Sequence, residues 1–271
     1  MEGVYVLKFG GNVIRSREDM MRLSGEISQL VLDGTRMILV HGGGPEISME
    51  MEKRGLVTKK VGGVRVTDAE GLEIAELVLR RLNDEIVGCL GEASVKAVGS
   101  AGSLFTVCRR KAPCTVFEGG NKTTVDLGYV GEVCEVNTES LEDLLDVGVV
   151  PVIYPIGVDA EGRKLNVNAD TMAAGIAAGI KCRELITITD VRGILMDTSD
   201  PGSKIDRLTL AEVDELIGKG VISGGMIPKV EACRDALNAG VEAVRMVDGR
   251  DGGSIVTDIM RNIPQGTVIV K

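Results

Sequence analysis

Short runs of β-branched and aliphatic residues alternate with helical patterns along most of this chain. Segment 4–9, VYVLKF, predicts a buried strand, and the apolar spacing after Ser16 predicts a helix that this serine caps. The pattern recurs with a strand at 37–40 and a helix that has Pro45 at its first position. Repeated strand–helix order is typical of an α/β fold, with a largely parallel sheet and helices on both of its faces.

The middle of the chain departs from this order. A long amphipathic helix is expected at about 69–90, and segment 95–136 then alternates in twos around glycine turns, which predicts hairpins. Strand–helix alternation resumes afterwards, and a division into two lobes is expected near residue 180. The later strands are expected at 149–157, 184–191, 241–249 and 267–270, and the later helices at 168–180 and 226–240.

Composition excludes several classes of protein. The 271 residues are 44% hydrophobic and carry a net charge of −9, whereas a protein that binds nucleic acid or an anionic membrane would be basic. Neither an 18-residue apolar run nor a signal peptide is recognisable, so we expect a cytoplasmic protein. The six cysteines form no CxxC pair and are predicted to be reduced, and with a single histidine no dedicated metal site is expected.

Three glycine-rich segments follow predicted strands: KFGGN at 8–12, HGGGP at 41–45 and SGGMIPK at 223–229. In parallel sheets ligands bind beyond the carboxyl ends of the strands, and a helix N-terminus there attracts anions. None of the three segments matches the P-loop or the dinucleotide fingerprint. Each of them, taken alone, is equally compatible with an ordinary turn.

Two lysines favour a functional interpretation of these glycine segments. Lys8 leaves a buried strand beside the first glycine pair, and Lys229 lies just inside a predicted helix. Segment 164–175 adds a polar cluster in which either Asn168 or Asp170 can cap the next helix. An acid placed between two lysines would hold both ammonium groups in position, as phosphoryl transfer requires.

Eight segments, KFGGN, VHGGGP, GVRVTD, GYVGEV, PVIYPIG, NVNAD, ITDVRGIL and GGMIPK, occur in order over nearly the whole chain. Together they resemble the amino acid kinase family, and within it the members that phosphorylate N-acetyl-L-glutamate for arginine biosynthesis. The resemblance implies a three-layer α/β/α sandwich. It also implies an acceptor-binding and dimerising lobe at 1–180, an ATP-binding lobe at 181–271, and ATP with Mg²⁺ as cofactor.

The same resemblance assigns roles to individual residues. Lys8 and Lys229 would stabilise the transferring phosphoryl group, and Asp170 would orient both lysines. The acceptor is expected to meet Gly43, Gly44, Arg65 and Asn166. The nucleotide is expected to meet Gly10, Gly11, Asp190, Val191, Arg192, Gly193, Ile194, Leu195, Val221, Ile222 and Ser223.

General acid–base chemistry is not needed for such a reaction. A γ-carboxylate has a pKa of about 4.3 and is already ionised at pH 7. His41, the single histidine, is therefore interpreted as a structural residue at a strand end.

Some features leave alternatives open. Segment 99–104 is shorter than the corresponding family loop, and this shortening would enlarge the acceptor pocket. A kinase of a related acceptor, such as carrier-linked aminoadipate, and a non-catalytic homologue that binds nucleotide or amino acid are the alternatives. Because the first strand begins at about Val4, no extra N-terminal helix is expected, and we predict a homodimer.

Overall fold

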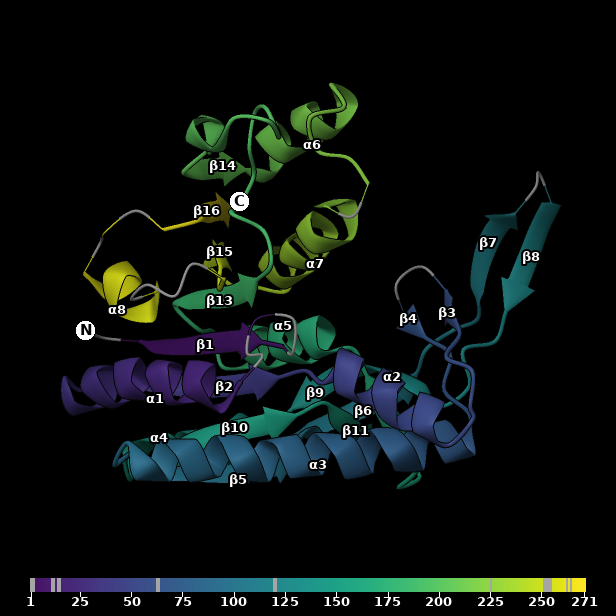
Figure 1. Ribbon diagram of the computed structural model, residues 1–271, viewed down its shortest axis with the longest axis horizontal. Coiled ribbons are helices and arrows are strands. Elements are labelled where there is room, and N and C mark those ends of the chain that lie inside the picture. Colours follow the sequence, from purple (N-terminus) through teal and green to yellow (C-terminus); the bar gives the residue numbers. More distant parts are fainter. Residues whose placement is uncertain are drawn as a thin grey trace.

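The computed structural model describes residues 3–10, 13, 16–61, 64–118, 121–224, 226–250, 255–261, 263 and 265–271, and at 116–118, 121, 122, 228 and 260 it describes the backbone alone. An eight-stranded sheet forms its centre (Figure 1). Neighbouring strands are parallel, except that β15 and β16 are antiparallel. In spatial order the strands are β14 (Arg207–Thr209), β16 (Thr267–Val270), β15 (Ala243–Asp248), β13 (Glu184–Thr189), β1 (Val4–Phe9), β2 (Arg36–His41), β10 (Val150–Tyr154) and β5 (Ala97–Ala101).

Helices cover both faces of this sheet, because its strands are apolar on both sides. Leu7 and Phe9 of β1 point into one core and Val6 points into the other. The first core packs against α1 (Arg17–Leu32), α3 (Ala69–Glu92) and α8 (Ile255–Met260); the second packs against α4 (Thr138–Asp146), α5 (Ala169–Gly179), α6 (Leu210–Gly218) and α7 (Met226–Asn238). The predicted three-layer α/β/α sandwich is confirmed. Within the part of the chain that is described, no helix has the length and apolar character to cross a bilayer.

Smaller β elements surround the end of the sheet where the strands terminate. A small closed barrel contains β6 (Thr106–Arg110), β9 (Val130–Val136), β11 (Ile156–Val158) and β12 (Lys164–Val167). Two hairpins, β3 (Lys60–Val61) with β4 (Val64–Arg65) and β7 (Cys114–Glu118) with β8 (Asn121–Val125), project from the body (Figure 1). The short helix α2 (Gly44–Lys53) lies beside the first hairpin.

Two sequence-based predictions for this region need correction. The hairpins expected in 95–136 exist, but β5 belongs to the main sheet, where it pairs in parallel with β10. The single strand expected at 149–157 is divided into β10 and β11 at Pro155, whose missing N–H interrupts the ladder. Helices α4, α6 and α8 and strand β14 were not predicted.

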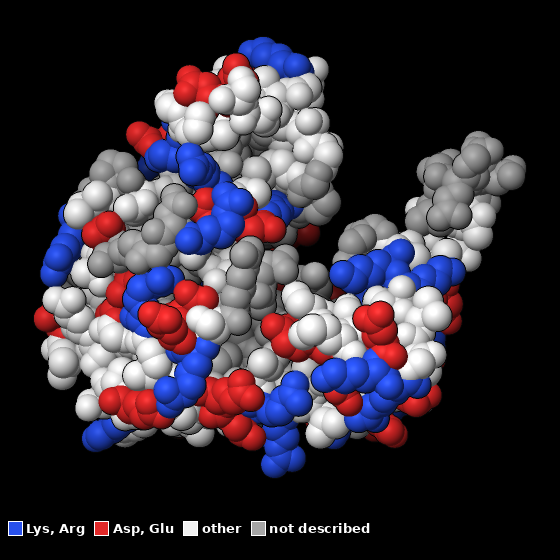
Figure 2. All heavy atoms as spheres, viewed as in Figure 1, with Lys and Arg blue, Asp and Glu red and all other residues white. Residues whose placement is uncertain are grey.

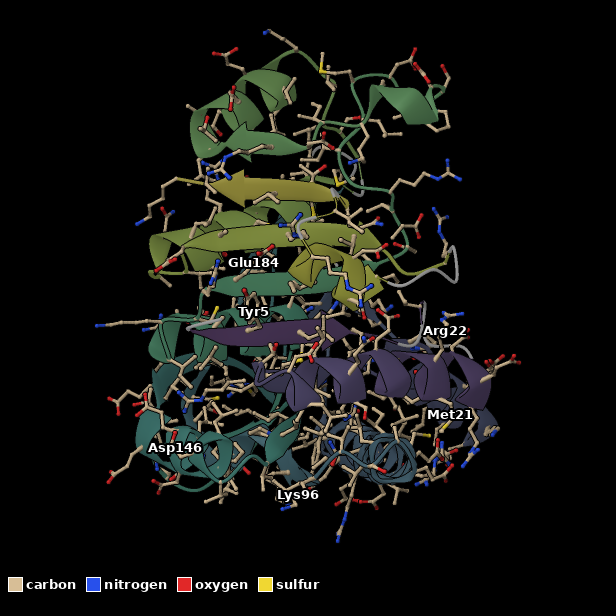
Figure 3. All side chains as sticks on the ribbon, turned by 90° about the vertical axis from the view of Figure 1, so that its left-hand side faces the viewer. Tyr5, Met21, Arg22, Lys96, Asp146 and Glu184 are labelled. Carbon is tan, nitrogen blue, oxygen red and sulfur yellow. The ribbon has the colours of Figure 1, made fainter. Side chains whose placement is uncertain are left out.

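The amino ends of the strands lie at the opposite edge of the sheet from these hairpins. Tyr5 of β1 and Glu184 of β13 are register partners on neighbouring strands (Figure 3). Arg245 of β15 donates from its Nε to the Glu184 carboxylate, and both side chains are largely buried. A structural ion pair therefore lies at this end of the strands.

His41 ends β2 inside the core and is only 1% exposed. Its Nδ1–H donates to the Gly42 carbonyl at 2.9 Å, and its Nε2 accepts from the Asn83 amide at 3.1 Å. Asn83 of α3 also donates to the Val152 carbonyl of β10 at 3.0 Å. Burial lowers the pKa of His41 to about 4, so the ring is neutral at physiological pH and links three elements.

This buried ring predicts a pH dependence of stability. Because its folded pKa of about 4 lies below the ordinary value of 6.5, the unfolded chain takes up a proton first as the pH falls. The free energy of unfolding is therefore expected to decrease through this pH window, with His41 contributing at most about 3 kcal/mol. Urea denaturation at several pH values measures this slope. His41→Gln should be less stable but should show a flatter slope; an unchanged slope would assign the effect to other groups.

Candidate active site

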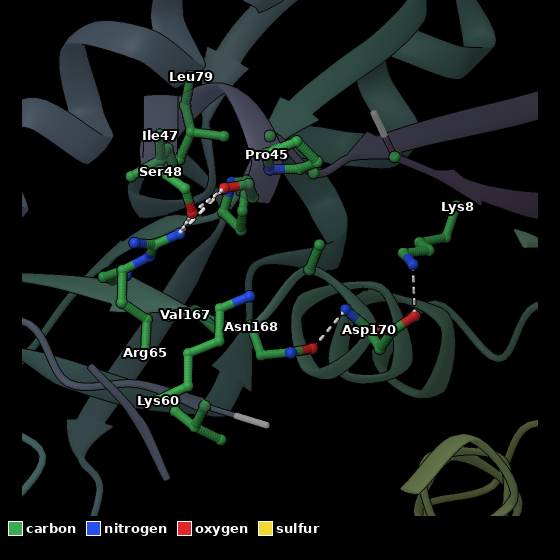
Figure 4. A pocket seen from close by; sticks show the side chains of 18 of the residues that line it. Lys8, Pro45, Ile47, Ser48, Lys60, Arg65, Leu79, Val167, Asn168 and Asp170 are labelled. Carbon is green, nitrogen blue, oxygen red and sulfur yellow. Dashed lines mark hydrogen bonds and ion pairs between the residues drawn. The ribbon is translucent and has the colours of Figure 1, made fainter. Parts of the chain in front are cut away.

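A cavity of about 500 Å³ opens at the carboxyl ends of β1, β2 and β13 (Figure 4). Figure 2 shows the surface hollowed between the part of the chain that carries α6 and α7 and the part that carries the two hairpins. The parallel pairing of the three central strands places their ends at one edge. Nine predicted site residues line this cavity: Lys8, Gly10, Gly43, Gly44, Arg65, Asn166, Asp170, Asp190 and Lys229.

Lys8 and Asp170 form an ion pair inside the cavity. Lys8 leaves the carboxyl end of β1 with only 15% of its side chain exposed, and its Nζ lies 2.7 Å from Oδ1 of Asp170. Asp170 stands in the first turn of α5, and Asn168 caps that helix by accepting from the backbone N–H groups of Asp170 and Thr171. The cap is therefore Asn168, and the Asp170 carboxylate remains available to Lys8.

Lys229 has an aspartate of its own. Its Nζ donates to Oγ1 of Thr189 and to Oδ1 of Asp190, both at 2.7 Å. This hydrogen bond from Lys229 lowers the pKa of the Asp190 carboxyl. The sequence predicts that Asp170 orients both lysines; the structure instead pairs Asp170 with Lys8 and Asp190 with Lys229, because Asp190 directly follows β13 and faces the start of α7.

Gly43 and Gly44 differ in what surrounds them. Gly43 is the N-cap of α2, and a Cβ atom there would lie 2.8 Å from Leu82 and 3.0 Å from Leu79 of α3. Packing against α3 therefore accounts for Gly43. A Cβ on Gly44 would meet nothing within 4 Å, so packing within the protein does not account for this glycine. Gly44 is the first residue of α2 and lines the cavity, so its N–H has no partner within the helix and is of the kind that suits an anion.

Arg65 ends β4 and is buried, with 8% of its surface exposed. Nη1 donates to Thr58 Oγ1 at 2.9 Å and contacts Met51 Sδ at 3.3 Å. Nη2 donates to the Gly44 carbonyl at 2.9 Å and to Ser48 Oγ at 2.7 Å (Figure 4). Burial lowers the pKa of Arg65, and no carboxylate of the described residues forms an ion pair with it.

Sequence reasoning found Arg65 but missed the residues that hold it. Ser48 and Met51 follow Gly44 by four and seven residues on α2, so they share one helix face with it. That spacing is the signal that would have pointed to them. Thr58 lies in the segment between α2 and β3 and carried no such signal.

Asn166 lies on β12 beside the same cavity. Its Nδ2 donates to Thr67 Oγ1 at 3.1 Å, and Thr67 in turn donates to the Arg65 carbonyl at 3.2 Å. The amide oxygen of Asn166 is not used in these bonds. Asn166 and Arg65 are thus brought to one side of the cavity from elements about a hundred residues apart in sequence.

The residues predicted for the nucleotide lie further along the same edge. A second cavity of about 460 Å³ shares Lys8, Asp170 and Lys229 with the first and continues along α7. Gly11 lies outside the described residues. The remaining predicted residues, Val191, Arg192, Gly193, Ile194, Leu195, Val221, Ile222 and Ser223, line neither cavity.

Two of these side chains belong to the core. Ile194 and Ile222 are each 2% exposed, so only their backbone groups are available to a ligand. Gly193 has a φ of +107°, and the next backbone N–H, that of Ile194, is bonded to Thr267 Oγ1. Segment 190–195 is thus a fixed loop after β13, and its role in nucleotide binding remains a prediction.

Segment 99–104 does not line the first cavity. It forms the end of β5 and the 3₁₀ turn η1 (Gly102–Leu104). The hypothesis that its shortness enlarges this cavity therefore has no support in the geometry. Of the described residues, no three His, Cys, Asp or Glu side chains are arranged to hold a metal ion.

An α/β sandwich with lysines and a helix N-terminus at the carboxyl ends of its strands is typical of proteins that transfer phosphoryl groups. The family model described as "Amino acid kinase family" matches residues 3–248. The chain belongs to the amino acid kinase family.

Relatives and solved structures agree with this assignment. The acetylglutamate kinase of Methanothrix thermoacetophila is 41% identical over 99% of this chain and 92% of its own length. That of Methanosphaera stadtmanae is 42% identical over 97% of this chain and 90% of its own length. Carbamate kinase from Giardia lamblia bound to AMP-PNP shares the fold with a TM-score of 0.72 at 16% identity, covering 99% and 98% of the two chains. N-acetylglutamate synthase from Neisseria gonorrhoeae, complexed with coenzyme A and N-acetyl-glutamate, gives a TM-score of 0.83 at 23% identity, over 99% of this chain and 59% of that one.

The different contacts of Asp170 and Asn168 predict different effects of their substitution. Asp170→Asn removes the charge beside Lys8 but leaves the cap in place, so kcat should fall by about tenfold or more while the KM for ATP changes little. Asn168→Ala removes the cap and should cost about 1 kcal/mol, lowering Tm by a few degrees. Steady-state kinetics and thermal melts of both variants measure this. A fully active Asp170→Asn variant that is merely less stable would make Asp170 a structural residue.

Proposed function

We propose that this chain is an ATP-dependent kinase that phosphorylates the γ-carboxylate of N-acetyl-L-glutamate, a step of arginine biosynthesis. The observation that carries the proposal is the position of Arg65. Its buried guanidinium lacks a carboxylate partner among the described residues and lies in the same cavity as the Lys8–Asp170 and Lys229–Asp190 pairs. A site of this kind suits an acceptor with a carboxylate to anchor and another to phosphorylate.

The proposed reaction is a direct displacement. An oxygen of the γ-carboxylate attacks the γ-phosphorus of ATP, the bond to the β,γ-bridging oxygen breaks, and ADP leaves with that electron pair. No proton has to be removed from the acceptor, because the carboxylate is already ionised near neutral pH. Lys8 and Lys229 would stabilise charge on the transferring phosphoryl oxygens, with Asp170 and Asp190 as positioning residues.

Mg²⁺ fits this site as a companion of the ATP phosphates. Such ions are usually held by one or two carboxylates together with substrate phosphates. Because the two aspartates of the cavity are already paired with lysines, the ATP phosphates would supply most of the ligands. The ion would neutralise charge on the phosphates.

The acceptor would be bound by Gly43, Gly44, Arg65 and Asn166 of the lobe formed by residues 1–180. The nucleotide would be bound by residues 181–271, chiefly by the loops at 190–195 and 221–223, in the cytoplasm, where ATP is made available.

A homodimer is the proposed assembly, and its support comes from the edge of the main sheet. β5 is an edge strand with one unpaired side, and apolar side chains lie exposed on it and near it: Leu77, Val98 and Leu104 are 55%, 38% and 65% exposed. Edge strands with apolar neighbours favour pairing with a second chain.

Sedimentation velocity tests this assembly. The wild-type protein is expected to sediment as a dimer, and Val98→Asp, which places a charge at that edge, should shift it towards monomer. The matched control is Val57→Asp, because Val57 is 90% exposed and lies in the segment between α2 and β3. A monomeric wild type, or a dimer that neither change affects, would contradict this edge as the interface.

A panel of acceptors tests the proposed reaction. Purified protein with ATP and Mg²⁺ is offered N-acetylglutamate, glutamate, N-acetylaspartate, N-acetyl-aminoadipate and aspartate, and any acyl phosphate is trapped by hydroxylamine. N-acetylglutamate should give the highest kcat/KM, and Arg65→Lys should raise its KM about tenfold or more. Lysine cannot make the set of contacts with Thr58, Ser48 and the Gly44 carbonyl that holds this charge in the cavity.

Lysine variants serve as controls in the same assay. Lys8→Ala and Lys229→Ala should each lower kcat about a hundredfold, while exposed Lys219→Ala should not change it. A preference for aminoadipate derivatives would keep the kinase and refute the acceptor. Absence of any acyl phosphate would favour a non-catalytic binding protein.

A further inference from the structure

Lys60 is a cation of this cavity to which neither the family motifs nor the sequence pattern assigned a role. It lies on β3 and lines the cavity together with Arg65. The two are register partners in the antiparallel β3–β4 pair. Directly opposite residues in such a pair project their side chains from the same face. The hairpin therefore presents two cations to the cavity from one face.

The orientation of Lys60 differs from that of Arg65. Figure 4 shows the Lys60 side chain extended into the cavity, whereas the Arg65 guanidinium folds back towards Ser48 and the start of α2. The preceding Lys59 is exposed and does not line the cavity. Successive residues of an extended segment point to opposite sides, which explains this contrast.

Charge balance indicates what the Lys60 ammonium is for. Four cationic and two anionic side chains line the cavity. Lys8 and Lys229 are paired with Asp170 and Asp190. Among the described residues no carboxylate forms an ion pair with Lys60 or with Arg65. Two positive charges are thus left for a ligand, and N-acetylglutamate carries two carboxylates.

Arg65 alone is poorly placed to serve both carboxylates. Its two terminal nitrogens already donate to Thr58, the Gly44 carbonyl and Ser48 and contact Met51. A guanidinium has five N–H groups, so these contacts engage four of them. A lysine on a flexible stem, by contrast, offers a compact charge that follows the ligand.

We propose that Lys60 binds the reacting γ-carboxylate of the acceptor, while Arg65 holds the α-carboxylate. This inference rests on the proposed function. The γ-carboxylate has to approach the anionic γ-phosphate, and a cation on the acceptor side offsets their repulsion at the moment of attack. Lys60 is then a catalytic residue of the transfer and sets the preference for a dicarboxylate together with Arg65.

The test combines variants with a truncated acceptor. Lys60→Gln, Arg65→Gln and the matched control Lys59→Gln are assayed with N-acetylglutamate and with 4-acetamidobutanoate, which keeps the reacting carboxylate but lacks the α-carboxylate. A high enzyme concentration allows the rate to be measured even with an acceptor that reacts about a thousandfold more slowly. Lys60→Gln should lower kcat/KM about thirtyfold or more with both acceptors, and Arg65→Gln chiefly with N-acetylglutamate. Lys59→Gln should stay within about twofold of wild type, and Lys60→Arg should restore most of the rate.

Three results separate the possibilities. If Lys60→Gln behaves like Lys59→Gln, Lys60 is a solvated surface residue and the inference is wrong. If its loss disappears with 4-acetamidobutanoate, both cations serve the α-carboxylate and the inference is again wrong. A wild type that makes no acyl phosphate from N-acetylglutamate refutes the proposed function instead. The same variants on whichever panel acceptor it does phosphorylate then decide the role of Lys60. Thermal melts of each variant confirm that the folded state is retained.

Discussion

Parallel pairing of β1 with β2 on one side and with β13 on the other is the constraint on which this site depends. It places the residues at the carboxyl end of each strand, Lys8 to Gly10, Gly42 to Gly44 and Thr189 to Asp190, close together although they come from distant parts of the sequence. An antiparallel partner would have sent one of these segments to the opposite edge. The parallel register therefore brings the lining residues of the cavity together at the ends of these strands.

Charges in the cavity are arranged in two different ways. The lysines at the reacting end are each fixed by an aspartate, so their positions are set before any ligand arrives. The cations of the β3–β4 hairpin have no such partners among the described residues. Lysines held in position suit charge that develops at a fixed place in a transition state. Cations without a partner suit a ligand that brings its own negative charges. In the proposed reaction the two halves of the cavity would thus have distinct electrostatic tasks.

Sequence patterns predicted the strands and the glycine turns well, because strand edges, caps and turn residues are local signals. Ser16 is the predicted cap, and β1 and β16 have the predicted bounds. The patterns also pointed to the lysines and Arg65. They could not assign Lys229 to Asp190, since that pairing depends on how α7 meets the end of β13. Nor could they separate β5 from the hairpins, because its place beside β10 is decided by packing on α3.

The position of Lys60 beside the cavity could not be predicted from the sequence either. In the sequence it is one of two adjacent lysines, and adjacent charges normally lie on a solvated face. Only the two-residue ladder with β4 decides which of the pair faces the cavity. A one-residue shift in this short ladder would turn Lys60 away from the cavity and bring Lys59 to its place.

Burial of Arg65 links folding to selectivity. Desolvation lowers the pKa of this guanidinium, which means that the folded protein holds a charge that water would solvate better. Hydrogen bonds to Ser48, Thr58 and the Gly44 carbonyl offset only part of this cost, since none of these acceptors is charged. A bound carboxylate would offset the rest, and an acceptor without one would not. In the proposed function, an acceptor with a carboxylate beside Arg65 would therefore be favoured over one without, because only the first offsets the cost of the unpaired charge.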